Sequence, residues 1–360
     1  MTTFFYNLFL GEMMNANFSP LLIGSFPHKD IDYIANLVLD DLKDYPMWVQ
    51  LPNRTFYESM YVQYSEGLPF VNINIDDKKI FFSNPENEPE ELLDFYSKVE
   101  ENDIENFKIT EKFSAGLYKF AELKEKIIAN NPKAVKGHTT GPFSFALTVT
   151  DENKRASWFD VNLRDIIKTG LKMKALWQIG FLKKIKKEVI FFIDEPYLAS
   201  IGSGVMSINR DEVAETIYSF IDEIKAEYPD VKIAIHCCGN TDWSIILDSP
   251  ADILSYDSYN YGKSLLLYKD KLAKFLEKGG AIAWGAVPTS EEIESISIDE
   301  LKSKITELLD EAKNICKTRK VSDFSFISPA CGTGSLSEKT AEKILSMTSI
   351  LSDEMEKIYG

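Results

Sequence analysis

Short apolar stretches rich in β-branched and aromatic residues recur along the chain, and each is followed by a longer amphipathic segment. The stretches are apolar almost throughout instead of alternating with polar residues. This pattern is typical of strands in a parallel sheet, because such strands are buried on both faces. Eight predicted strands can be identified: residues 20–26, 47–52, 133–141, 188–196, 231–239, 251–257, 280–288 and 322–332.

The segments between these stretches carry apolar residues at three- and four-residue spacing, which indicates amphipathic helices. Eight strand–helix units predict an α/β fold, a single (β/α)8 TIM barrel, with an open doubly wound sheet as the alternative. Residues 66–132 are more than one crossover needs, and residues 76–91 within them indicate a hairpin or excursion after the second strand. Since no linker rich in Pro, Gly or Ser interrupts the series, we expect residues 1–360 to form one domain with this insertion.

Composition narrows the classes of function. The chain is 44% hydrophobic and 27% charged, as in soluble globular proteins. Its net charge of −16 argues against nucleic acid as a partner, because that binding depends on basic residues. The apolar residues 1–14 lack a basic leader and are too few to span a membrane, so we expect no membrane association. Four cysteines do not suggest a disulfide framework, and reduced thiols predict a cytoplasmic protein.

Histidine and cysteine gather where predicted strands end. His236 and Cys238 end the fifth strand, Asp257 ends the sixth and Cys331 ends the eighth. In a barrel these ends converge on one site, and alternate residues of a strand point to the same side, so His236 and Cys238 can reach one ion while Cys237 points away. Thiolate and imidazole are ligands that zinc prefers. The pattern predicts a zinc site, the alternative being that these are buried core side chains.

Six motifs follow one another along nearly the whole chain, from about residue 20: IGSFP (23–27), VKGHTTGP (135–142), IDEP (193–196), HCC (236–238), ADILSYD (251–257) and SPACG (328–332). Together they resemble the C-terminal catalytic barrel of cobalamin-independent methionine synthase. More broadly, they are similar to the zinc methyltransferases and uroporphyrinogen decarboxylases that share this barrel.

The resemblance implies a set of metal ligands. His236, Cys238 and Cys331 match the zinc ligands of the family, and Asp257 stands where the family has a zinc-bound Glu. The shorter Asp is a departure, which either still binds the metal or leaves the fourth position to a water or a backbone oxygen.

The resemblance also implies an acceptor site. Four residues match positions that hold the amino-acid substrate in methionine synthases: Ile23, Gly24, Ser25 and Asp194. By themselves, without the resemblance, these residues favour a structural interpretation: a tight turn at Gly24 and Ser25 and a helix cap at Asp194. Gln63 stands at the family's amine-binding Glu, with Glu58 nearby, and an amide holds an ammonium less well than a carboxylate does. We expect homocysteine as the acceptor, with a thiol lacking the amine, such as coenzyme M, as the alternative.

The methyl donor follows from two departures. Folate-dependent members have a catalytic His after the seventh strand and a folate-contacting Glu after IDEP, where this chain has Trp284 and Ser200. Methyltetrahydrofolate needs a proton donor to leave, whereas methylcobalamin does not. The resemblance thus implies a zinc-dependent methyltransferase that moves a methyl group from methylcobalamin or a corrinoid protein to a small thiol, as in methionine biosynthesis. A folate-dependent methionine synthase-like enzyme is an alternative.

Further residues on the same rim have candidate roles. His28 and His138 follow strand ends as candidate catalytic acids or carboxylate-binding groups, or as ordinary loop histidines. Trp243, Tyr259 and Trp284 provide aromatic surface for a flat corrin ring, or rim packing. Two other classes stay open: a metal-free decarboxylase-like barrel, which the cysteines disfavour, and a non-catalytic barrel that binds a corrinoid protein.

Overall fold

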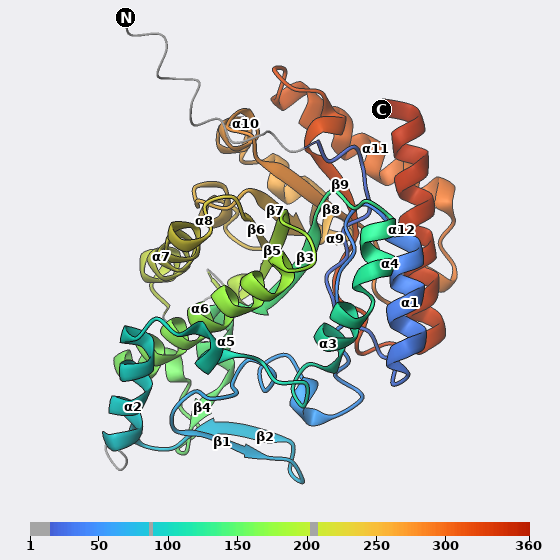
Figure 1. The fold of residues 1–360 in the computed structure, drawn as a ribbon. Coiled ribbons are helices and arrows are strands. Elements are labelled where there is room, and N and C mark those ends of the chain that lie inside the picture. Colours follow the sequence, from blue (N-terminus) through green and yellow to red (C-terminus); the bar gives the residue numbers. More distant parts are fainter. Residues whose placement is uncertain (1–14, 86–88, 202–207) are drawn as a thin grey trace, which may run out of the picture.

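A computed structural model describes residues 15–85, 89–201 and 208–360 of the chain and has a mixed α/β fold (Figure 1). Its centre is a parallel sheet of six strands in the order β3-β5-β6-β7-β8-β9. These correspond to the last six predicted strands, and nearly all of their residues are buried, as their continuous apolar pattern predicts. The strands are β3 (Val135–Thr140), β5 (Val189–Asp194), β6 (Lys232–Cys237), β7 (Ile253–Tyr256), β8 (Ala281–Val287) and β9 (Ser325–Pro329).

The first two predicted strands are not regular strands, which corrects the expectation of eight. Residues 20–26 and 47–52 are instead held by single parallel bridges that join Pro20 to Ile327 in β9, Ser25 to Gln50, and Met47 to Lys136 in β3. The physical reason lies in the backbone. Prolines at 20, 27, 46 and 52 lack the N–H that a ladder needs, and Gly24 has a positive φ of 151°, which interrupts an extended run. The two segments thus lie between β9 and β3 without forming full ladders.

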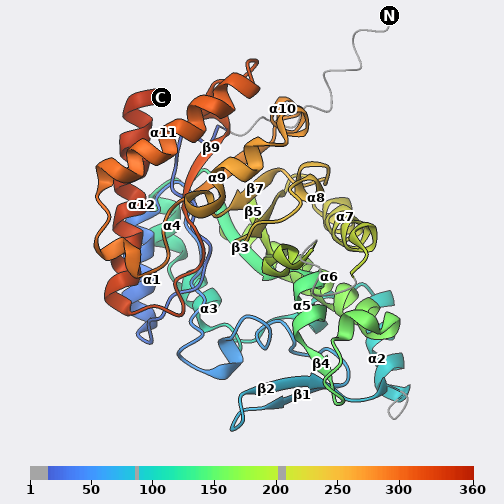
Figure 2. The same cartoon turned by 180° about the vertical axis from the view of Figure 1, so that it is seen from behind.

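Helices cover the outside of the sheet, with α7 and α8 on one side and α1 and α12 on the other (Figures 1 and 2). The helices that connect and cover the central strands are α1 (Ile31–Asp41), α3 (Ala115–Glu122), α4 (Lys124–Ala129), α5 (Pro142–Thr148), α6 (Val161–Lys183), α7 (Arg210–Glu227), α8 (Ser244–Leu247), α9 (Ser258–Leu266), α10 (Lys269–Glu277), α11 (Ile298–Ile315) and α12 (Glu338–Tyr359). Within the described ranges, none of the helices has the length and hydrophobicity that a bilayer crossing requires. Residues 1–14 lie outside the described residues.

The predicted insertion contains a hairpin, which lies at residues 71–82 and so begins earlier than the expected 76–91. Strands β1 (Val71–Asn74) and β2 (Lys79–Phe82) pair antiparallel, and β2 pairs in parallel with β4 (Thr150–Asp151) in a second, three-stranded sheet. Helix α2 (Pro89–Glu100) follows, beside the hairpin at one end of the molecule (Figure 1), and residues 86–88 lie outside the description. Phe95 and Phe107 of this region belong to the same buried cluster as the central strands, so the insertion packs on the main core.

Candidate metal centre

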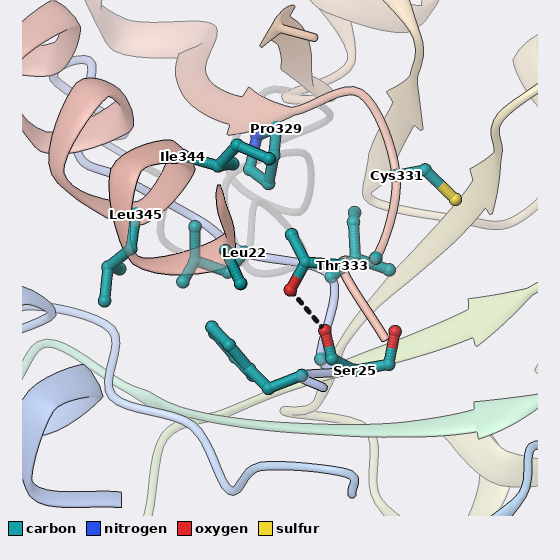
Figure 3. Close-up of a pocket in the computed structure, with 12 residues that line it drawn as sticks. Leu22, Ser25, Pro329, Cys331, Thr333, Ile344 and Leu345 are labelled. Carbon is teal, nitrogen blue, oxygen red and sulfur yellow. Dashed lines mark hydrogen bonds between the residues drawn. The ribbon is translucent and has the colours of Figure 1, made fainter. Parts of the chain in front are cut away.

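Three predicted zinc ligands come together at the carboxyl ends of the central strands. His236 lies in β6, Cys238 follows this strand directly, and Cys331 follows β9. One imidazole nitrogen and the two Sγ atoms all lie within 4.8 Å of one another. Figure 3 shows the loop after β9, with the sulfur of Cys331 turned away from the apolar side chains of Ile344 and Leu345. Two segments far apart in sequence therefore supply one imidazole and two sulfurs to a single point.

The surroundings of His236 fit a metal ligand. The residue is buried, with 2% of its surface exposed, and its Nδ1 is 3.0 Å from the hydroxyl of Ser255. Its Nε2 has no hydrogen-bond partner among the described residues. A metal-bound histidine uses one nitrogen for the metal and fixes the ring by a hydrogen bond from the other, so this arrangement suits an ion at Nε2.

The two cysteines influence each other's ionisation. A hydrogen bond with Cys331, helped by His236 and opposed by burial, lowers the pKa of Cys238 to about 4. The same hydrogen bond, together with burial and the charge of Cys238, raises the pKa of Cys331 well above its usual range. Of the two sulfurs Cys238 therefore ionises more easily, and the thiolate is the form that binds metals.

Asp257 is not a member of this group of three. Its carboxylate caps α9 by accepting hydrogen bonds from the backbone N–H of Asn260, at 2.9 Å, and from that residue's side-chain amide, at 2.7 Å. Burial raises the pKa of Asp257, and the charges of Cys238 and His236 also act on it, so its carboxylate is close to the centre. A role for Asp257 as fourth ligand remains a prediction.

A cavity of about 440 Å³ opens beside the three ligands. Four of the six predicted acceptor-site residues line it together with the ligands: Ile23, Gly24, Ser25 and Asp194. His138, a candidate acid or carboxylate-binding group, lines it as well. The loop that carries Cys331 is tied to this wall, because Thr333 donates its N–H and its hydroxyl to the carbonyl of Ser25, both at 2.9 Å (Figure 3 draws the hydroxyl bond). The structure thus places the predicted metal ligands and the predicted acceptor-site residues around one cavity.

Adjacent acidic residues at the end of β5 have different surroundings. Asp194 has one carboxylate oxygen, Oδ1, that is buried without a partner in the described part of the chain. Burial raises its pKa to about 6, although His236 and Lys136 act in the opposite direction. Glu195 is the residue that caps a helix, since it accepts hydrogen bonds from the N–H groups of Phe143 and Ser144 at the start of α5. The residue that caps a helix is therefore Glu195 and not Asp194. The sequence analysis did not identify Glu195 in this role.

The structure does not place Gln63, Glu58 or His28 at the cavity wall. The Gln63 amide is fully buried, donating to the carbonyl of Phe113 at 2.7 Å and accepting from Gln50 at 2.8 Å. Sequence reasoning missed Gln50, which does line the cavity, because only the tertiary contact with Gln63 reveals it.

Glu58 and His28, which do not line the cavity either, each contact another polar side chain. Glu58 is buried beside Arg54, with its Oε1 2.8 Å from Nε, and Nε2 of His28 lies 3.2 Å from Glu342. Each of these side chains thus has a charged partner away from the metal ligands.

The structure buries two of the three aromatic residues expected to face a corrin ring, which corrects that expectation for the two tryptophans. Trp243 and Trp284 are fully buried, and their indole N–H groups donate to Ser264 and Ser325. Tyr259 is partly exposed but donates its hydroxyl to Glu292 at 2.6 Å. The tryptophan rings belong to the core because long apolar strands and helices bury them on all sides.

Comparison with known proteins identifies similar folds. No protein-family model matches the sequence, and no curated protein matches it. A methyltransferase from Methanosarcina mazei is 15% identical over 90% of this chain and 86% of its own, with a TM-score of 0.51. A B12-independent methionine synthase from Shewanella sp. W3-18-1, solved in complex with selenomethionine, is 17% identical over 66% of this chain and 67% of its own, with a TM-score of 0.44. The first likeness shows that the fold is shared.

Proposed function

We propose that this protein is a zinc-dependent methyltransferase that moves a methyl group from a methylcorrinoid to a small thiol, with homocysteine as the first choice of acceptor. The observation that carries the proposal is the convergence of His236, Cys238 and Cys331 within 4.8 Å beside a cavity. The motif resemblance supports it, as does the fold shared with a methyltransferase. The bridges at residues 20–25 and 47–50 support a closed (β/α)8 barrel, in which these segments take the places of the first two strands.

The residues at the centre suit zinc because two sulfurs and one imidazole are a donor set that this ion favours. When bound, zinc would supply the positive charge that lets an incoming thiol lose its proton at neutral pH. Ser255 holds the ring of His236 through Nδ1, so that Nε2 would be the nitrogen that binds the ion. Sulfur ligands also favour a reducing compartment, which is why we propose a cytoplasmic location.

The cavity wall favours an acceptor that carries an amine. The unpartnered oxygen of Asp194 is a buried acceptor beside the metal ligands, and an ammonium group would satisfy it. The replacement of the family's Glu by Gln63 removes no charge from the cavity wall, since Gln63 lies behind Gln50. Both observations support homocysteine over a thiol without an amine, such as coenzyme M.

A methylcorrinoid is the donor most compatible with the seventh strand of the predicted barrel. In the family's folate-dependent members a proton donor stands there, but in this chain Trp284 points into the core. In transfer from methylcobalamin the sulfur–carbon bond forms as the cobalt–carbon bond breaks, and the electron pair stays on cobalt, so the donor needs no acid. Free methylcobalamin and a corrinoid protein are both compatible with this chemistry.

The proposal is tested by incubating purified protein with methylcobalamin and a thiol while the visible spectrum of the corrinoid is recorded. We expect demethylation with homocysteine and a product of methionine, and loss of both in Cys331→Ser. Cys316→Ser is the matched control, because Cys316 is fully buried at the end of α11, outside the group of three. Absence of zinc from the purified protein, together with no demethylation by any thiol, would refute the proposal.

A further inference from the structure

His138 is held between two surfaces in the cavity wall. Its ring stacks on the indole of Trp48, with ring centroids 3.9 Å apart and planes inclined by 15°. On the other side is Gly24, where a Cβ atom would lie 2.8 Å from Cε1 of the ring. A glycine at this position is therefore required both by the positive φ and by the closeness of the imidazole.

The backbone of His138 and its stacking partner are fixed by the same side chain. Gln178 accepts the N–H of His138 at 3.1 Å and the indole N–H of Trp48 at 3.0 Å through one oxygen, and its amide donates to the carbonyl of His138 at 3.0 Å. Tyr64 donates its hydroxyl to that same carbonyl at 2.8 Å. Position and plane of the imidazole are thus set by neighbours that make no hydrogen bond with its nitrogens, as expected for a preorganised binding group.

The ring nitrogens themselves are left without partners. Both Nδ1 and Nε2 of His138 are buried and lack a hydrogen bond within the described residues, although only 2% of the side chain is exposed. Buried polar atoms in native proteins are nearly always paired, so two unpaired nitrogens in one fixed ring call for an explanation. Because His138 lines the cavity that contains the metal ligands, a molecule bound there would supply the missing partner.

The position of Lys136 beneath the ring of His138 indicates what kind of chemical group would pair with the imidazole. Lys136 lies two residues earlier on the same face of β3, fully buried, and its Nζ donates to the carbonyl of Ile23 at 2.6 Å. Burial, followed by the charge of Lys136, lowers the pKa of His138 well below its usual value, so the ring is neutral and keeps one N–H donor. Burial lowers the pKa of Lys136 to about 7, while the charge of Asp194 acts in the opposite direction. An anionic acceptor suits this arrangement, because it would accept the N–H of the neutral ring and favour the protonated form of Lys136.

The register of the central sheet gives the relative positions of His138, Asp194 and His236 in the cavity wall. His138 pairs with Phe192, and Asp194, two residues further along β5, pairs with His236. Asp194 therefore lies on the strand between His138 and the metal ligands, and one level closer to them. A thiol whose sulfur lies at the metal centre would pass Asp194 before its far end reaches His138.

From this arrangement we infer that His138 binds the anionic end of the acceptor thiol, its N–H donating to a carboxylate or sulfonate while Lys136 supplies positive charge beneath. The inference rests on the proposed function, because it requires a thiol at the metal centre. It assigns the two charged groups of the acceptor, which share the α-carbon in homocysteine, to two places in the wall: the amine to Asp194 and the anion to His138.

The test is a calorimetric titration of the zinc-loaded protein with four thiols. Homocysteine carries an amine and a carboxylate, mercaptobutyrate only the carboxylate, coenzyme M only a sulfonate, and aminopropanethiol only the amine. We expect His138→Leu to raise the Kd of the three anionic thiols roughly tenfold or more, and to leave aminopropanethiol unchanged. His138→Gln, which keeps an N–H donor, should recover part of the affinity. The anion that gains most from His138 identifies whether a carboxylate or a sulfonate is preferred.

His28→Leu is the matched control, because it also removes a buried histidine but one that pairs with Glu342 away from the cavity. Equal losses for all four thiols, or no loss for the anionic ones, would overturn the inference while leaving the proposed function intact. Failure of every thiol to bind the wild-type protein would instead overturn both. If His138→Leu does not fold, Lys136→Met takes its place, with the same selective loss expected.

Discussion

Asp194 and Glu195 are neighbours in sequence, yet the structure places them in two different regions. Glu195 lies behind the cavity and its carboxylate is paired with two backbone N–H groups, as the Gln63 amide is paired with Gln50 and Phe113. Asp194 belongs to the cavity wall, where its Oδ1 and atoms of two other side chains lack partners among the described residues. Pairing stabilises the fold, whereas unpaired buried atoms are tolerated where a ligand completes them. The difference separates residues that support the site from residues that act in it.

The largest effect is expected from removing a metal ligand. His236→Ala should lose most of the zinc, because two sulfurs without the imidazole leave too few protein ligands. Elemental analysis of the purified variant measures this directly. The matched variant His28→Ala removes an equally buried ring and should retain zinc. Equal zinc content in both variants would mean that the three ligands do not act together.

The second prediction contrasts the two acidic neighbours by their effect on folding. Glu195→Ala should lower the free energy of unfolding by about 1–3 kcal/mol, because the N–H groups of Phe143 and Ser144 lose their acceptor. Asp194→Asn should leave it nearly unchanged, since Oδ1 has no partner to lose within the described structure. Urea titration monitored by circular dichroism measures both. A larger loss in the Asp194 variant would reverse the assignment of the two residues.

The third prediction concerns Glu195 and the dependence of folding stability on pH. Burial raises the pKa of Glu195 to about 7 from 4.5, so between these values the folded chain holds a proton that the unfolded chain has released. The stability that this group contributes is therefore full below pH 4.5 and declines as the pH rises to 7. Glu195→Gln cannot titrate and should make stability less dependent on pH across this window. Urea titrations at several pH values give the free energy of unfolding of both proteins. The same dependence on pH in Glu195→Gln as in the wild type would contradict the predicted pKa shift.

A smaller effect on zinc affinity is expected from Ser255, which contacts the predicted ligand His236. Ser255→Ala removes the hydrogen bond to Nδ1 of His236 without touching a ligand, and should weaken zinc affinity roughly tenfold by freeing the ring. Competition with a chromogenic chelator gives the affinity. Ser264→Ala is a suitable control, because Ser264 bonds Trp243 instead of a metal ligand. Equal affinities for zinc in the Ser255 variant and the wild type would show that packing alone holds the imidazole.

The smallest effect is expected at the buried tryptophan. Trp284→Phe keeps an aromatic ring in the core and should change the KM for methylcobalamin by less than about twofold, because the indole is fully buried. Steady-state assays with varied methylcobalamin measure this. A large increase in KM would mean that the corrin does reach this ring, and would restore the interpretation drawn from sequence.

Much of the fold was predictable because its signal is local. Continuous apolar runs located the six strands of the central sheet, since burial on both faces leaves a pattern that survives without tertiary information. The first two segments have similar composition but form only single bridges, as proline and a glycine with positive φ prevent regular ladders. The apolar composition of these segments indicated where they lie in the sheet. The geometry of their backbone decided that they form single bridges and not regular strands.

By itself the sequence determined where strands end and that His236, Cys238 and Cys331 lie at such ends, because strand periodicity and shared strand direction are consequences of local chemistry. Only the tertiary structure decided which of two adjacent acids caps a helix, that Trp284 lies inside the core, and that His138 stands unpaired between Trp48 and Gly24. The reason is physical: a side chain's partners come from segments distant in sequence, and nothing in its own neighbourhood along the chain specifies them.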